Sequence, residues 1–177
     1  MFPLLTTERL VLRKVEQTDA TAVLKGYSDP LVNRYMSVAY YSLEEVQKQL
    51  DFYKSIYETG TGTWWAICTK DDPSTVIGNG GLNNYRKQHR CIEIGYWLLP
   101  SAQRKGYAAE VVKAICRYAF TQLEVHRIEA IVEGGNDNSI KLLEILGFSC
   151  EGTHRQCEIK NGYYIDLIYY ALFNPSH

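Results

Sequence analysis

A strand–helix–strand unit in the middle of the chain constrains its fold more than any other feature. Cys91 to Leu99 (CIEIGYWLL) is predicted to be a strand that Pro100 ends, and Arg127 to Glu133 (RIEAIVE) a second strand. Between them, Gly106 to Leu123 carries apolar residues at helical spacing. The unit predicts a mixed α/β domain in which a helix crosses between two strands.

Two predicted antiparallel hairpins flank this unit. The first joins the aromatic segment Thr63–Thr69 to Val76–Tyr85 through an Asp-Pro turn. The second joins 149–159 to 163–172 through Asn161-Gly162, a typical two-residue hairpin turn. The sequence therefore predicts antiparallel pairs on both sides of the central unit.

The N-terminal third is predicted to be a strand followed by helices. Leu10–Lys14 is the strand, and Asp19–Tyr27 has helical spacing up to Pro30, after which 31–35 forms a short turn. Ser42-Leu-Glu-Glu45 is a capping box that opens a helix to about Glu58, with Val46, Leu50, Tyr53 and Tyr57 on one face.

The totals exclude several classes of protein. A chain of 177 residues fits one domain, predicted here to span residues 1–177. The net charge of -1 argues against a general nucleic-acid binder, and no apolar run approaches the roughly 20 residues of a membrane span. No signal peptide is expected.

Five cysteines without a C-x-x-C pair are predicted to be buried free thiols in a cytoplasmic protein. His89, His126, His154 and His177 lack metal-ligand spacing, so no metal is expected.

The loop Gln103-Arg-Lys-Gly-Tyr-Ala108, between the central strand and helix, is the candidate binding feature. Backbone amides at a helix start are unpaired and the helix dipole favours an anion there. Gly106 lets a phosphate approach the backbone, and Arg104 and Lys105 add positive charge. Alternatively, the loop needs glycine for its turn and basic residues for solubility; its own residues leave both readings open.

A longer stretch carries a family resemblance. Glu93–Glu110 resembles the core of the Gcn5-related N-acetyltransferase (GNAT) family, and its loop is similar to that family's [Q/R]-x-x-G-x-[G/A] motif. Asn136-Asp-Asn-Ser139 and Leu143–Phe148 resemble the N-x-x-S and E-x-x-G-F segment further along. The segments 5–13 and 164–172 are similar to the branch that contains the Rim-type ribosomal-protein N-terminal acetyltransferases. The resemblance covers nearly the whole chain.

This resemblance implies the GNAT α/β fold. Its sheet is twisted and mostly antiparallel, with about seven strands, helices on both faces and a central splay between Glu93–Leu99 and Arg127–Glu133. It also implies acetyl-CoA as co-substrate, with its pantetheine arm in the splay. The residues implied to bind acetyl-CoA are Trp97, Leu98 and Leu99 through their backbone, the loop residues Gln103, Arg104, Lys105, Gly106, Tyr107 and Ala108, and Asn136 and Ser139.

Acetyl transfer to an amine requires that the amine lose a proton and that the departing thiolate be stabilised. Glu93, in the strand beside the splay, is the first candidate for base or amine binder; its alternative is a solvated strand carboxylate. Asp166 lies in an apolar strand and must have a partner, either the acceptor amine or an arginine. Ser139 resembles the family's serine and is the candidate that donates a proton to the departing thiolate; its alternative role is a helix cap.

Three functions stay open at this point. The branch favours a protein N-terminal α-amine as acceptor, and the second acceptor class is a small amine such as a polyamine, an aminoglycoside or an amino acid derivative. The third is a sensor that binds acyl-CoA without turnover. On the acceptor side of the site, a wide groove would suit a peptide end and a closed acidic pocket would suit a polyamine. A blocked acceptor site would suit a sensor. The resemblance also leaves a homodimer open.

Overall fold

A computed structural model of the chain describes residues 1–175, so His177 lies outside the described residues. Within that range eight strands form one sheet in the order β1-β2-β3-β4-β5-β6-β8-β7. The strands are β1 Leu5–Thr6, β2 Leu10–Lys14, β3 Thr63–Thr69, β4 Val76–Arg86, β5 Cys91–Leu98, β6 Arg127–Glu133, β7 Ser149–Lys160 and β8 Tyr163–Phe173.

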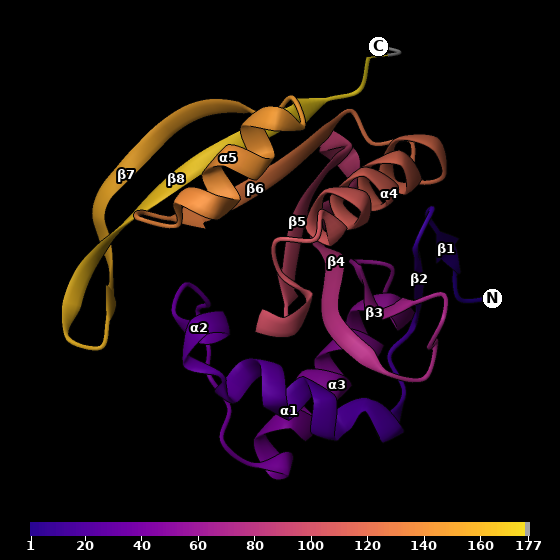
Figure 1. The fold of residues 1–177 in the computed structure, drawn as a ribbon. Helices are drawn as coiled ribbons and strands as arrows, with labels where there is room; N and C mark the ends of the chain where they lie inside the picture. Colours follow the sequence, from indigo (N-terminus) through magenta and orange to yellow (C-terminus); the bar gives the residue numbers. More distant parts are fainter. Residues whose placement is uncertain (176–177) are drawn as a thin grey trace.

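Helices cover both faces of the sheet, as Figure 1 shows. They are α1 Ala20–Ser28, α2 Pro30–Asn33, α3 Leu43–Glu58, α4 Tyr107–Thr121 and α5 Asp137–Ile145, with 3-10 turns at Gln17–Asp19, Lys87–His89 and Pro100–Ala102. The apolar stripe of α4 packs on one face against Trp65, Leu82 and Ile128. Val23 and Val46, from α1 and α3, pack on the other face with Trp97 and Leu99.

The central strand–helix–strand unit gives the sheet its one parallel pair, β5 with β6. Only three residue pairs join them: Cys91 with Arg127, Ile92 with Ile128 and Glu93 with Glu129. Beyond Glu93, β5 continues to Leu98 beside β4 alone. The predicted splay is therefore confirmed, and it leaves one edge of β5 without a neighbouring strand from Gly95 onwards.

Most predicted elements are confirmed, including the capping box of Ser42 and Glu45 at the start of α3. Strand β1 was not predicted, because a strand of two residues carries no alternation to detect. The prediction of buried cysteines is wrong for Cys150 and Cys157, which are exposed. Both lie in β7, the edge strand of the sheet, where every residue but Lys160 is exposed.

No helix among residues 1–175 is long and apolar enough to cross a membrane. In the same range no group of three or more His, Cys, Asp or Glu side chains lies close enough together to hold a metal ion.

Candidate active site

The predicted loop ends at the first turn of α4. Gly106 is the residue before the helix and has a φ of +80°, in the left-handed region that favours glycine. No side chain caps this end of α4, so the first-turn amides remain available to a ligand. Helix α4 is 15 residues long and its N-terminal end is open, which favours the binding of an anion there.

A cavity of about 430 Å³ runs from this helix start to the splay. Of the residues implied to bind the co-substrate, all but two line it: Trp97, Leu98, Gln103, Arg104, Gly106, Tyr107, Ala108, Asn136 and Ser139. Lys105 is exposed in the loop beside it. The amide of Leu99 donates to Ile77 O at 2.8 Å, so the fold already uses that donor. We call this the donor cavity.

A second cavity of about 550 Å³ lies on the other side of the splay. Residues of β5 and β6 form one wall, and aromatic side chains from α1, α3 and the loop between α2 and α3 form the other: Tyr27, Phe52, Tyr35 and Tyr40. The two cavities share Tyr35, Met36, Tyr96, Trp97, Asn136 and Ser139. They therefore meet at the splay, and we call the second one the acceptor cavity.

Glu93 lines the acceptor cavity, half-buried. Its carboxylate accepts a hydrogen bond from Asn84 Nδ2 at 3.0 Å, and no cation pairs with it within residues 1–175. Glu133, the other carboxylate in the lining, pairs with Lys160 at 2.7 Å. Glu93 is thus the carboxylate in this cavity that a cationic amine could reach unopposed.

Trp64 lines the same cavity as Glu93. Its ring stacks on Tyr53, with centroids 5.1 Å apart, and lies against Gly95 and Gly81. A Cβ on Gly81 would stand 2.3 Å from that ring, so only glycine leaves room for it. Trp65, the next residue, is fully buried in the core, so the two tryptophans alternate between the acceptor cavity and the core.

Ser139 and Asn136 lie where the cavities meet. Ser139 Oγ is 2.9 Å from Tyr96 Oη, and the Ser139 amide donates to Asn136 Oδ1 at 3.4 Å. Asn136 therefore caps α5, while its Nδ2 makes no hydrogen bond with a described residue. Burial raises the pKa of Tyr96 above its ordinary value, and the hydrogen bond with Ser139 offsets part of that rise.

Asp166 lies apart from Glu93 and Ser139. It is in β8, and its Oδ1 accepts a hydrogen bond from the Gln156 amide at 2.7 Å. That contact closes the irregular stretch of the β7–β8 pair between His154 and Glu158. Neither the donor nor the acceptor cavity includes Asp166 in its lining.

Two residues near the site were not singled out by the sequence. Tyr96 was one of 14 tyrosines, and only the folded structure shows which tyrosine faces Ser139. Arg9 comes from the N-terminal segment; its guanidinium lies 4.6 Å from the centre of the Tyr107 ring and pairs with Glu110. Nothing in the local sequence around Arg9 indicates that it lies at the start of α4.

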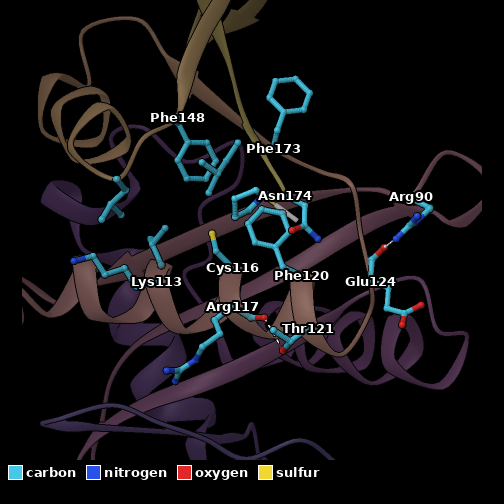
Figure 2. Close-up of a pocket in the computed structure, with 14 residues that line it drawn as sticks. Arg90, Lys113, Cys116, Arg117, Phe120, Thr121, Glu124, Phe148, Phe173 and Asn174 are labelled. Atoms are coloured by element: carbon cyan, nitrogen blue, oxygen red, sulfur yellow. Dashed lines mark hydrogen bonds between the residues drawn. The ribbon is translucent and has the colours of Figure 1, made fainter. Parts of the chain in front are cut away.

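A larger hollow, of about 920 Å³, lies elsewhere, along the C-terminal half of α4 (Figure 2). Phe120, Phe148 and Phe173 line it, together with the basic side chains Lys113 and Arg117. None of the predicted site residues belongs to it. It offers neither the open helix start nor the open strand edge of the donor cavity, so size alone does not make it the site.

The comparison with known proteins decides the family. Residues 9–149 match the family described as "Acetyltransferase (GNAT) domain". The chain belongs to the GNAT family. It is 34% identical over 176 residues to the N-acetyltransferase YoaA of Bacillus subtilis (strain 168), covering 99% of each protein. The predictions of the family, the fold and an N-acetyltransferase are thereby confirmed.

Two further known proteins are similar to the chain over nearly its whole length. The [ribosomal protein uS5]-alanine N-acetyltransferase of Escherichia coli (strain K12) is 27% identical over 182 residues, covering 97% of this chain and 91% of that one. RimL, described as a ribosomal L7/L12 alpha-N-protein acetyltransferase in complex with coenzyme A, superimposes with a TM-score of 0.88 at 20% identity. That match covers 97% of this chain and 98% of RimL, and it concerns the fold.

Proposed function

We propose that this GNAT enzyme moves the acetyl group of acetyl-CoA to the N-terminal α-amine of a protein. One observation carries the proposal: a cavity that starts at an open helix N-terminus and a cavity that holds an unpaired carboxylate meet at the splay of β5 and β6. The names of the uS5-alanine enzyme and of RimL support a protein acceptor.

The residues of the donor cavity fit acetyl-CoA, which supplies an activated acetyl thioester when bound. The amides at the start of α4, with Gly106 and Arg104, hold the pyrophosphate, and Lys105 adds charge at the edge of the loop. The open edge of β5 at Trp97 and Leu98 would bind the pantetheine arm through backbone groups other than Leu98 O, which accepts from Gln103 Nε2 at 2.9 Å. Asn136 Nδ2 would add a side-chain donor. Backbone donors in a fixed cleft suit a carbonyl oxygen that gains charge, because they need no reorganisation.

Glu93 binds the acceptor amine and takes its proton, directly or through a water molecule. The new N–C bond forms as the C–S bond breaks, so the acetyl group passes from sulfur to nitrogen. The thiolate departs toward Ser139. Both reactants are held together, and no covalent enzyme intermediate is needed. We assign Asp166 no part in this transfer, since a backbone amide already satisfies it.

The charges of the acceptor cavity favour a single cation. Lys160 neutralises Glu133, and Lys48 adds a positive charge to the lining. Glu93 is left to bind one ammonium group, whereas a polyamine carries several and calls for several carboxylates. The aromatic walls around Glu93 leave apolar surface for the residue that bears the amine.

We further propose that the whole chain is one domain and that it acts in the cytoplasm. All eight strands found within residues 1–175 belong to one sheet, which supports the first point. Five free cysteines, two of them exposed, support a reducing compartment.

The acceptor is tested by thiol release from acetyl-CoA with a panel of amines. Peptides with a free N-terminal alanine or serine are expected to give a kcat/KM at least about tenfold above that of spermidine, because one unpaired carboxylate binds one cation. Peptides with a blocked N-terminus and an internal lysine serve as the control for side-chain amines. A preference for spermidine would contradict the protein-terminus proposal and leave the acetyltransferase class intact.

A further inference from the structure

Two hydroxyl groups meet at the junction of the two cavities. Tyr96 Oη and Ser139 Oγ are 2.9 Å apart; Tyr96 lies in the part of β5 that has one open edge, and Ser139 lies in the first turn of α5. Both residues line both cavities. Among the described residues, this pair is the one hydrogen bond between two side-chain hydroxyls at the splay.

The direction of this hydrogen bond follows from the two groups. The distance fits either direction, but a phenol is a more acidic and stronger donor than an aliphatic alcohol, which favours Tyr96 as the donor and Ser139 Oγ as the acceptor. The Ser139 amide is already directed to Asn136 Oδ1, which fixes the serine at its place in the helix. With Tyr96 as the donor, the hydroxyl proton of Ser139 is the one left for a ligand at the junction.

We propose that Tyr96 is a positioning residue that turns the Ser139 hydroxyl toward the departing CoA sulfur, so that the pair stabilises a thiolate by hydrogen bonding. The inference rests on the proposed function, since it requires CoA in the donor cavity. It assigns a role to one tyrosine that neither the motifs nor the family match single out.

The pair donates a hydrogen bond and keeps its protons. A cysteine thiol has an ordinary pKa of about 8.5 and a tyrosine one of about 10. Burial raises the pKa of Tyr96 further, so a proton transfer that left a phenolate there would run uphill. Tyr96 therefore remains neutral, and no O–H bond breaks in the pair.

The test is the pH dependence of CoA binding by the full chain. CoA is titrated calorimetrically at pH values below and above the pKa of its own thiol. The wild-type affinity for CoA is expected to rise as the thiol ionises. In Tyr96→Phe this rise is expected to be about tenfold smaller, because a hydrogen bond to a charged group typically contributes that much. Ser139→Ala should lose it too, and the double variant should lose no more than Ser139→Ala alone.

Acetyl-CoA is the control, because it has no free thiol: Tyr96→Phe should bind it as the wild type does. Other titratable and charged groups face the junction or pack behind it, and they are the same in every variant, so the comparison cancels them: Tyr35, Glu93, Arg104, Tyr107, Cys116 and Glu133.

Two results would overturn the inference. One is a Tyr96→Phe variant whose CoA affinity rises with pH as in the wild type. The other is a double variant in which the losses of the two single variants add up. A wild-type chain that binds neither CoA nor acetyl-CoA would instead overturn the proposed function, and the inference with it.

Discussion

Replacing Gly106 by valine is expected to lower the affinity for acetyl-CoA by at least about 100-fold. The glycine has a φ of +80° at the start of α4, where the pyrophosphate is proposed to meet the first-turn amides. A Cβ there would stand 3.2 Å from Arg9 Nη2 and would occupy the space into which a phosphate must come. Losing two hydrogen bonds to a charged group, at about 1.5–3 kcal/mol each, accounts for this loss.

Gly60→Val is the matched control for backbone strain. Gly60 also has a positive φ, +68°, but nothing lies within 4 Å of a Cβ built on it, and it follows α3, far from the loop in the sequence. Both substitutions should destabilise the fold by about 1–2 kcal/mol, the usual cost of a side chain in the left-handed region. Only Gly106→Val should lose acetyl-CoA by calorimetry. Equal losses in both variants, or none in Gly106→Val, would show that the loop does not hold the pyrophosphate.

The Glu93→Gln substitution is expected to reduce kcat about 100-fold while leaving the affinity for acetyl-CoA unchanged. Glutamine keeps the size of the side chain and its contact with Asn84, but it cannot take a proton from the acceptor amine. General base catalysis contributes about 10²–10⁴-fold, and a water molecule can replace part of it. The measurement is steady-state turnover with the best amine of the panel, alongside calorimetry of acetyl-CoA.

Asp166→Asn makes the same chemical change in another strand of the same sheet. Because Asp166 accepts a hydrogen bond from the Gln156 amide and lines neither cavity, its amide variant should turn over at the wild-type rate. If Asp166→Asn were slow and Glu93→Gln normal, the two residues would have to exchange roles, and the acceptor would lie on the β7–β8 side.

The sequence predicts those parts of the fold that local signals determine. The capping box of Ser42 and Glu45 places the start of α3, and the Asn161-Gly162 turn places the β7–β8 hairpin. The predicted apolar face of α3 is rotated slightly in the structure: Gln49 and Ile56 are buried with Val46 and Tyr53, while Leu50 and Tyr57 are half-buried. The aromatic residues packed against α3 from α1 and β3 set that rotation, and no local pattern encodes them.

The site divides in the same way. The donor loop is a contiguous motif, so its residues could be named from the sequence, and most of them line one cavity. The acceptor side depends on contacts between distant segments. Lys160 neutralises Glu133 across 27 positions, and Tyr96 meets Ser139 across 43. Such pairs appear only when β5, β6, β7 and α5 are assembled, which is why the sequence left the acceptor open.

The central claim is that acetyl-CoA lies in the splay, with its pyrophosphate at the start of α4. Amide hydrogen exchange with and without acetyl-CoA tests it directly, because bound backbone groups exchange more slowly. Added protection is expected along the open edge of β5, at residues 95–98, and in the loop and first turn at 104–109. Protection confined to the hollow of Figure 2, at residues 116–124 and 172–174, would contradict the claim.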